Sequence, residues 1–184
     1  MTELQGDHVL LRGFRADEVA VALDRMQAIP AVELDEEAAR ERRERLERSG
    51  ERNGSEIMFA VEADGRLVGD VQGRCPRLAM PPGVWELGIE LWDEADRGRG
   101  VGRETIALLS SHLFDDEDAI RVQATTDVDN VAMRRVLEAL GFRFEGILRG
   151  FMPDPPGPPR DYAMYGVTRS DWGAAVSARP KPTP

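Results

Sequence analysis

The sequence predicts a single mixed α+β domain, and three observations carry this prediction. Strand-like and helix-like segments alternate along the 184 residues without an internal repeat. The dipeptide Asp64-Gly65 lies between two apolar runs, which is a strong signal for a β-hairpin. A loop rich in glycine and arginine, DRGRGVG at 96–102, separates an alternating apolar strand from a helical pattern. The predicted domain covers residues 1–172, and residues 173–184 are expected to form a flexible tail.

The first part of the chain is expected to contain one strand, two helices and a hairpin. Val19, Leu23 and Met26 have the spacing of one helical face. The next helix is highly charged and closes in glycine and asparagine, which favour a helix stop. The predicted bounds are a strand at 8–14, helices at 16–26 and 35–54, and hairpin strands at 57–63 and 66–74.

The strand that follows, VWELGIELW at 84–92, has the clearest two-residue period in the chain. Large apolar residues occupy alternate positions, and Glu86, Gly88 and Glu90 occupy the positions between them. One face of this strand is therefore expected to be buried, and the other to be polar.

The rest of the chain is expected to add two helices and three strands. Met133, Val136, Leu137 and Leu140 recur with helical spacing, and Gly141 follows where a helix C-cap belongs. The predicted bounds are a helix from 102 to about 115, a strand at 120–126, a helix at 127–142, and strands at 142–152 and 160–172 around a proline-rich loop.

The composition fits a globular domain and excludes several classes of protein. Hydrophobic residues make up 41% and charged residues 32%, which is typical of neither disordered nor membrane proteins. No apolar run is long enough to span a bilayer, and the first residues lack a signal-peptide pattern. The single cysteine, Cys75, suits a reducing compartment, so we expect a cytoplasmic protein. His8, His112 and Cys75 lack the spacing of zinc ligands, and no metal is expected.

The negative net charge of the chain favours some binding partners over others. A net charge of −10 repels nucleic acid and anionic membranes, so neither is expected to bind. A cationic partner, such as an amine or a basic peptide, is favoured. The only lysine, Lys181, lies in the proline-rich tail, which excludes a buried catalytic lysine. Both a monomer and a homodimer are compatible with the sequence.

The glycine-arginine loop has to be compared with three kinds of phosphate-binding loop. The P-loop of nucleoside triphosphatases requires a lysine that this loop lacks. The dinucleotide-binding fingerprint G-x-G-x-x-G fails, because position 103 is arginine where its last glycine belongs. The acyl-coenzyme A loop, Q/R-x-x-G-x-G/A, is satisfied by Arg97, Gly100 and Gly102.

On these residues the sequence resembles the GNAT superfamily of N-acetyltransferases. It is most similar to the RimJ/RimL-type branch, which contains ribosomal-protein N-terminal acetyltransferases. The resemblance covers roughly residues 7 to 172 and rests on several motifs in the same order. WELGIEL is similar to the branch's strand 4, and RGRGVGRET to its pyrophosphate loop and the helix that follows the loop. DNVAMRRVLEALGFRFEGILR resembles its asparagine-containing helix and the turn after it, and RDYAMYGVTRSDW its closing strand.

The resemblance implies a mostly antiparallel sheet of six to seven strands, splayed after strand 4 and flanked by about four helices. It also implies that acetyl-CoA is the co-substrate, with its pantetheine arm in the gap of the splayed sheet. The implied contacts of acetyl-CoA are the backbone of Ile89, Glu90 and Leu91, and the loop residues Arg97, Gly98, Arg99, Gly100, Val101 and Gly102, of which Arg99 to Gly102 would hold the pyrophosphate through their backbone N–H groups. Asn130 would contact the cofactor arm, and Arg134 or Arg135 an anionic part of it.

The expected reaction is attack of a primary amine, either a protein N-terminus or a small-molecule amine, on the thioester. Free amines are mostly protonated at neutral pH, and a carboxylate can remove that proton directly or through water. Glu86 occupies the position of the family's strand-4 glutamate, so the resemblance implies that it is the general base. Glu90, on the same face, and Tyr162 are the expected contacts of the acceptor.

Two positions depart from the family pattern. Where many members have a tyrosine that protonates the leaving thiolate, this chain has Leu137, and the serine of RimL-like members is Met133. A second hypothesis is therefore a catalytically weak acyl-CoA-binding regulatory protein, and a third is a nucleotide-binding protein that uses the same loop. Glu86 and Glu90 also fit a plain solvent-exposed strand face, and Asn130 also fits a helix cap.

Overall fold

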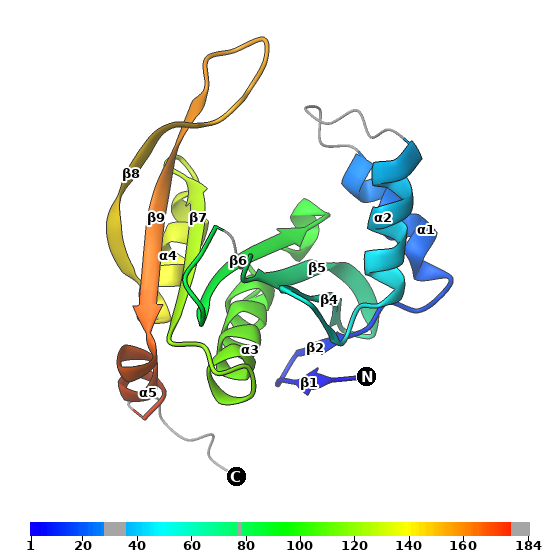
Figure 1. Cartoon of the computed structure of the whole chain (residues 1–184), viewed down its shortest axis with the longest axis horizontal. Helices are drawn as coiled ribbons and strands as arrows, with labels where there is room; N and C mark the ends of the chain where they lie inside the picture. The colour runs from blue at the N-terminus through cyan, green and yellow to red at the C-terminus, as the bar shows by residue number, and fades with distance from the viewer. Residues whose placement is uncertain (28–35, 77–78, 178–184) are drawn as a thin grey trace.

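The structure is a computed structural model, and it describes residues 1–27, 36–76 and 79–177. One open sheet runs through this part of the molecule in the order β1-β2-β4-β5-β6-β7-β9-β8, with β3 paired to β4 (Figure 1). All pairs are antiparallel except β6 and β7, which are parallel. The strands are β1 (Leu4–Gln5), β2 (Val9–Arg12), β3 (Arg52–Asn53), β4 (Glu56–Ala63), β5 (Arg66–Arg74), β6 (Val84–Leu91), β7 (Arg121–Asp127), β8 (Arg143–Met152) and β9 (Arg160–Thr168).

The mixed, mostly antiparallel α+β architecture is confirmed. The seven predicted strands are present, and the two further strands, β1 and β3, have two residues each, too short for a periodic pattern. The helices are α1 (Glu18–Gln27), α2 (Glu36–Glu47), the one-turn 3-10 helix η1 (Glu94–Asp96), α3 (Val101–Asp115), α4 (Val131–Ala139) and α5 (Arg169–Ser177).

Two predicted bounds are wrong. The charged helix was expected to run to residue 54, but α2 ends at Glu47 and residues 52–53 pair with β4 as β3. The last strand was expected to reach residue 172 and to lead into a tail, but α5 occupies 169–177. The backbone N–H of Asp171 donates to Thr168 Oγ1, which caps the helix start, and the Trp172 ring stacks on Phe114. Residues 178–184 lie outside the described residues.

The helices cover both faces of the sheet. On β4, Ile57, Phe59 and Val61 join the main core with α3, whereas Met58 and Ala60 pack with α1 and α2. This alternation follows from the two-residue period of a strand, and it explains why nearly all of β4 is buried. The sheet thus separates α3 on one face from the α1–α2 pair on the other.

The sheet splays between β6 and β7. The two strands pair only from Val84 with Arg121 to Leu87 with Ala124. Beyond that point β6 continues to Leu91 with β5 as its neighbour, and β7 continues along β9. The predicted gap after the fourth long strand is therefore present, and it opens beside Gly88.

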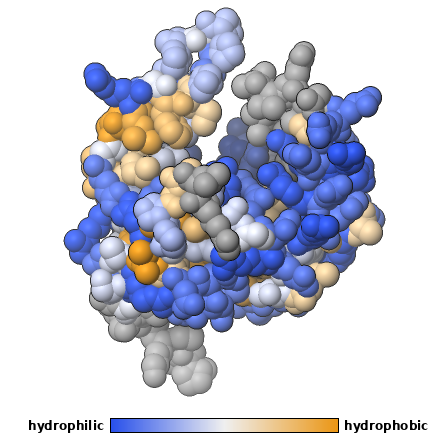
Figure 2. Space-filling model, in the orientation of Figure 1, coloured by the Kyte–Doolittle hydropathy of each residue, from blue (hydrophilic) through white to orange (hydrophobic). Residues whose placement is uncertain are grey.

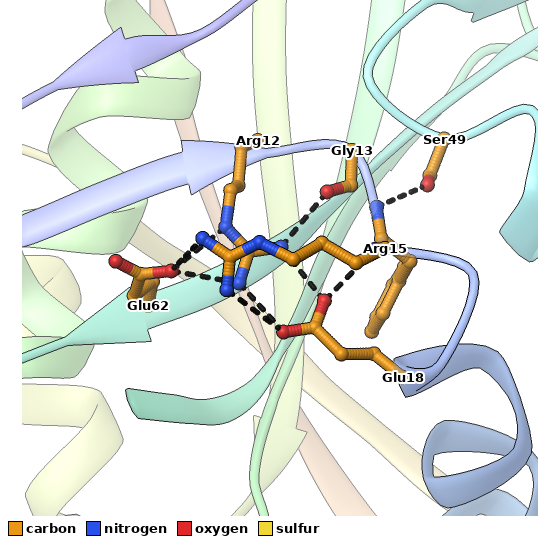
Figure 3. Close-up of polar contacts among 7 residues, drawn as sticks. Arg12, Gly13, Arg15, Glu18, Ser49 and Glu62 are labelled. Carbon is orange, nitrogen blue, oxygen red and sulfur yellow. Dashed lines mark hydrogen bonds and ion pairs between the residues drawn. The ribbon is translucent and has the colours of Figure 1, made fainter. Parts of the chain in front are cut away.

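A buried ion cluster fastens α1 to the sheet (Figure 3). Arg12 of β2 is 4% exposed and donates hydrogen bonds of 2.8 Å to Glu18 of α1 and to Glu62 of β4. The hydrogen bond to Glu18 raises the pKa of Arg12 above its ordinary value. Arg15 joins the same two carboxylates from the solvent side. The cluster sets where α1 begins, and so where its hydrophobic face meets the sheet.

Candidate active site

The glycine-arginine loop leads from β6 into the N-terminus of α3. Gly98 and Gly100 have φ angles of 73° and 89°, a left-handed region that other residues avoid, so the turn requires glycine at both positions. Asp96 anchors the loop from below, because its buried carboxylate accepts from Arg66 at 2.9 Å and pairs with Arg99. The conformation of the loop is therefore supported by contacts within the protein and by its two glycines.

The N-terminus of α3 presents an anion-binding surface. α3 begins at Val101, and the first helical N–H that finds a partner in this turn is that of Glu104, which donates to the Gly100 carbonyl. The preceding N–H groups point out of the helix start, where the helix dipole is positive. Arg97 and Arg103 add two guanidinium groups at the same place, and Arg97 Nη2 also donates to the Leu91 carbonyl at 3.1 Å. Such an arrangement suits a pyrophosphate.

A cavity of about 500 Å³ extends from this helix end along β6 to α4. It reaches the open edge of β6 beyond the last β6–β7 pair, so a ligand lying in it would enter the splay. Its apolar wall comes from β6 on one side and from α4 on the other. The lining residues are Ile89, Glu90, Leu91, Arg97, Gly98, Gly100, Gly102, Arg103, Asn130, Ala132, Met133 and Val136.

Eight residues that the sequence suggested for acetyl-CoA contact come together in this lining, from three separate segments of the chain. They are Ile89, Glu90, Leu91, Arg97, Gly98, Gly100, Gly102 and Asn130. Arg103, Ala132 and Val136 were missed, although Arg103 directly follows the loop motif, and Ala132 and Val136 share a helix with Asn130. Ala132 and Val136 are four residues apart, and Val136 follows Met133 by three, so helical spacing places these lining residues on one face of α4.

Three of the suggested residues do not line this cavity with their side chains, and the expected backbone N–H contacts of Arg99 and Val101 stay predictions. The Arg99 side chain donates to Asp64 at 2.7 Å on the outer side of the loop. Val101 is 6% exposed and belongs to the main core, so only its backbone N–H is available to a ligand. Arg134 donates to the Tyr165 hydroxyl and to the Val128 carbonyl, and it helps to hold α4 against the sheet.

Asn130 both caps a helix and lines the cavity. Its Oδ1 accepts from the backbone N–H of Met133 at 3.1 Å, so it is the N-cap of α4. It also lines the cavity, where its amide nitrogen is not needed for the cap. The cap and the ligand contact are therefore compatible readings of the same residue.

The sheet face opposite α3 carries the polar residues of the central strands. Cross-strand register puts Arg74, Glu86 and Gln123 in one row across β5, β6 and β7. Arg74 donates to the Glu86 carboxylate at 3.2 Å. Glu86 precedes the last paired residue of β6, so it lies beside the point where the gap opens, although it does not line the cavity. Glu90, farther along β6, is exposed and does line it.

Asp70 is a buried carboxyl on the same face. Register pairs it directly with Glu90, and it accepts a hydrogen bond of 3.2 Å from Trp92 Nε1. Burial raises the pKa of Asp70 to about 6, against the hydrogen bond from Trp92, and the nearby Glu90 raises it further. No sequence motif singled out this residue.

A hollow lies between the β8–β9 hairpin and the α1–α2 side of the molecule (Figure 2). Apolar residues gather below the hairpin tip, and hydrophilic residues dominate the opposite wall. The exposed apolar side chains of β8 include Phe151 and Ile147, and the Phe151 ring lies 5.5 Å from that of Tyr162. Register pairs Tyr162 with Asp127 at the end of β7, so it lies beyond the splay.

The described residues that line the cavity include no hydroxyl or thiol group. Leu137 is fully buried in the core, and Met133 lines the cavity. The Tyr165 hydroxyl is engaged with Arg134 and Glu138 inside the core. No side chain at this site is thus an evident proton donor for a leaving thiolate.

The described residues form neither a metal-binding cluster nor a membrane-spanning helix. No group of three or more histidine, cysteine, aspartate or glutamate side chains is arranged to hold a metal ion. No helix among residues 1–27, 36–76 and 79–177 has the length and apolar character that crossing a membrane requires.

The sequence is similar to a known protein family. A family model described as an acetyltransferase (GNAT) domain matches residues 8–143. The uncharacterized N-acetyltransferase YoaA of Bacillus subtilis (strain 168) is 33% identical over 84 residues, which is 46% of this chain and 46% of that relative. The chain therefore matches less than half the length of this curated relative.

Solved structures share the whole fold. A GCN5-related N-acetyltransferase from Brucella melitensis has a TM-score of 0.66 at 27% identity, over 96% of this chain and 83% of that one. Mycobacterium smegmatis RimJ, solved in complex with CoA-disulfide, has a TM-score of 0.70 at 22% identity, over 92% of this chain and 88% of that one.

Proposed function

This chain belongs to the family of GNAT acetyltransferases, and we propose that it transfers the acetyl group of acetyl-CoA to a primary amine by direct attack. The observation that carries the proposal is the single cavity that joins the arginine-rich start of α3 to the open edge of β6. One end suits a pyrophosphate, and the other lies where the sheet leaves backbone groups without a strand partner.

In this proposal acetyl-CoA binds along the cavity. The backbone N–H groups at the start of α3, with Arg97 and Arg103, hold the pyrophosphate. The backbone of Ile89 to Leu91 meets the pantetheine arm and the thioester, because that part of β6 has no partner on β7. Glycine at 98 and 100 lets the loop backbone approach the phosphates closely.

The amine approaches from the opposite face, where Glu86 and Glu90 lie. Glu86 takes a proton from the ammonium group, directly or through water. The neutral nitrogen then attacks the carbonyl carbon, a C–N bond forms, and the C–S bond breaks with the electron pair leaving on sulfur. The nitrogen loses its second proton to water as the amide forms, and water protonates the thiolate, since no hydroxyl or thiol lines the described cavity. The acceptor is a protein α-amine or a small-molecule amine, and the net charge of −10 favours a basic one.

The Glu86→Gln variant tests the reaction. It keeps the size of the side chain and removes the base, so kcat is expected to fall by about 100-fold, the scale of general-base catalysis. The Kd of acetyl-CoA should not change, because Glu86 does not line the cavity. Glu94→Gln, an exposed residue of η1, is the matched control.

The lack of a proton donor in the lining is the one observation that favours a non-catalytic acyl-CoA-binding regulator. Turnover with a mixed pool of amines separates the two functions. Acetyl-CoA binding without acetylation of any amine would support the regulator. Unchanged turnover in Glu86→Gln would show that Glu86 is not the base, and the same assay on Glu90→Gln would then be needed to find it.

A further inference from the structure

Four residues form a row across the sheet on the α1–α2 side. Register aligns Arg12 of β2, Ala60 of β4, Asp70 of β5 and Glu90 of β6. Residues aligned in this way share one face of a sheet, and directly opposed side chains lie within contact reach. Gly69 allows β5 to approach β6 at this point, since a Cβ there would collide with the Glu90 carbonyl. The row ends at Glu90, in the lining of the acetyl-CoA cavity.

Asp70 is the unusual member of this row. It is 3% exposed, yet the proposed reaction does not use it. Its neighbour on β4, Ala60, has no polar side chain to pair with the carboxyl group. The hydrogen-bond donor of Asp70 is the Trp92 indole, two residues after Glu90. Glu90 and Trp92, the two neighbours of Asp70 on this side, both come after Leu87, the last residue of β6 that pairs with β7.

The charges that face Asp70 come from three elements. Glu90 on β6 opposes ionisation of Asp70, and Arg42 and Arg45 on α2 favour it. Arg12 on β2 is one strand farther away, behind Ala60, and its charge is taken up by Glu18 and Glu62. A cation bound beside Glu90 would offset the negative charge of Glu90 and so favour the ionised form of Asp70.

We propose that Asp70 is a positioning residue for the acceptor amine: it fixes the Trp92 indole and, acting through Glu90, strengthens binding of an ammonium group when it is ionised. This rests on the proposed function, since the ammonium group belongs to the amine that becomes acetylated. The Glu90 carboxylate supplies a negative charge, and in the proposal the half-buried Trp92 ring held by Asp70 supplies a π-face; an alkylammonium group binds favourably to both. Binding of the cation and loss of a proton from Asp70 are then linked, so acceptor affinity rises with pH through the ionisation of Asp70.

The test follows the Trp92 indole N–H by NMR in protein that carries ¹⁵N-tryptophan and is saturated with CoA, which prevents turnover. Trp92→Phe assigns the signal among the three tryptophans. Glycinamide is the cationic probe, because an α-amine stays protonated below pH 7. Uncharged N-acetylglycinamide is its matched control.

The expected signal of Trp92 titrates with a midpoint near the pKa of Asp70, about 6, and this titration is lost in Asp70→Asn. Glycinamide should lower the midpoint, and its Kd should fall about fivefold between pH 5 and pH 7, the scale of a modest coupling. N-acetylglycinamide should do neither. Asp70→Asn keeps an oxygen for Trp92, so it should fold and bind glycinamide with a pH-independent Kd.

Two results would overturn the inference. One is a Trp92 midpoint that glycinamide leaves in place, and the other is the same pH dependence of glycinamide binding in Asp70→Asn. Acetyl-CoA binding, measured separately on both proteins, distinguishes this failure from a failure of the proposed function. If acetyl-CoA binds and the Trp92 midpoint does not respond, only the role of Asp70 is lost.

Discussion

At the scale of single residues, Asp70 shows how a carboxyl can be important without belonging to a motif. It lies in the interior of β5, and both its neighbours, Trp92 and Glu90, are distant in sequence. A buried carboxyl with a raised pKa is destabilising when it is ionised, because its charge is removed from water. Proteins retain such groups at functional sites more often than elsewhere.

The first prediction is that Asp70 makes the protein less stable as pH rises from about 4 to about 6. The folded pKa of about 6 exceeds the ordinary 3.8, so in this window the folded state holds a proton that the unfolded state has lost. The free energy of unfolding therefore falls by up to about 3 kcal/mol, at 1.36 kcal/mol for each pH unit. Asp70→Asn, with no such proton, should gain stability relative to wild type at pH 7.5 but not at pH 4.

Urea unfolding at these two pH values measures the effect. Asp115→Asn, an exposed residue at the end of α3, is the control for loss of one negative charge. If the gain of Asp70→Asn over wild type is equal at both pH values, the carboxyl does not titrate in this window.

At the scale of elements, the ion cluster of Arg12 holds α1 in place. The side chains of Arg12, Glu18 and Glu62 are 5%, 14% and 15% exposed. Arg12→Ala leaves two carboxylates partly buried without their main partner, which is expected to cost about 3 to 5 kcal/mol of unfolding free energy. Arg15→Ala should cost less than about 1 kcal/mol, since Arg15 is mostly exposed.

Chemical denaturation of the two arginine variants side by side measures this difference. Similar losses for Arg12→Ala and Arg15→Ala would show that the cluster does not work as a buried unit.

The start of α3 gives a second prediction at this scale. Arg103→Ala is expected to raise the Kd of acetyl-CoA about tenfold, the worth of one charged hydrogen bond, and to weaken the salt dependence of binding. Arg135→Ala, an exposed arginine of α4 outside the cavity lining, should leave the Kd unchanged. Calorimetry at two salt concentrations checks both. Equal Kd values for the two variants would show that Arg103 does not contact the pyrophosphate.

Elements were predictable from the sequence where their pattern is local. The period of β6, the hairpin at Asp64-Gly65 and the start of α3 after the glycines all follow from short-range rules, and all are present. The α5 helix was mistaken for the end of a strand, because the alternation of β9 runs directly into it. The Thr168-x-x-Asp171 spacing was the signal that could have marked the boundary.

The lining of the cavity was predictable only in part from the sequence. Eight lining residues were reached through motifs, but Arg103 lies just outside the motif. The side-chain partners of Arg99 and Arg134 could not be predicted from the sequence, because Asp64 and Tyr165 come close to them only in the fold. The burial of Asp70 depends on α1 and α2 lying over the sheet, which no local pattern specifies.

At the scale of the whole molecule, the two faces of the sheet divide the proposed work. The cavity proposed for acetyl-CoA lies between β6 and α4, and Glu86, Asp70 and Glu90 face the α1–α2 side. The splay after Leu87 is the place where the two substrates can meet. The net charge of −10 coexists with a local concentration of arginine at the start of α3, so the cavity can attract an anion that the protein as a whole repels.

The central claim is that this cavity binds acetyl-CoA, and thermal unfolding tests it most directly. Acetyl-CoA at about 100 times its Kd should stabilise the fold by about 2.7 kcal/mol, or about 5 to 10 °C in Tm, whereas ATP and NAD should not. Gly100→Glu should abolish the shift, because it places a negative charge and an unfavourable φ angle at the phosphate end. A Tm that neither acetyl-CoA nor CoA raises, or a shift that survives in Gly100→Glu, would contradict this account of the site.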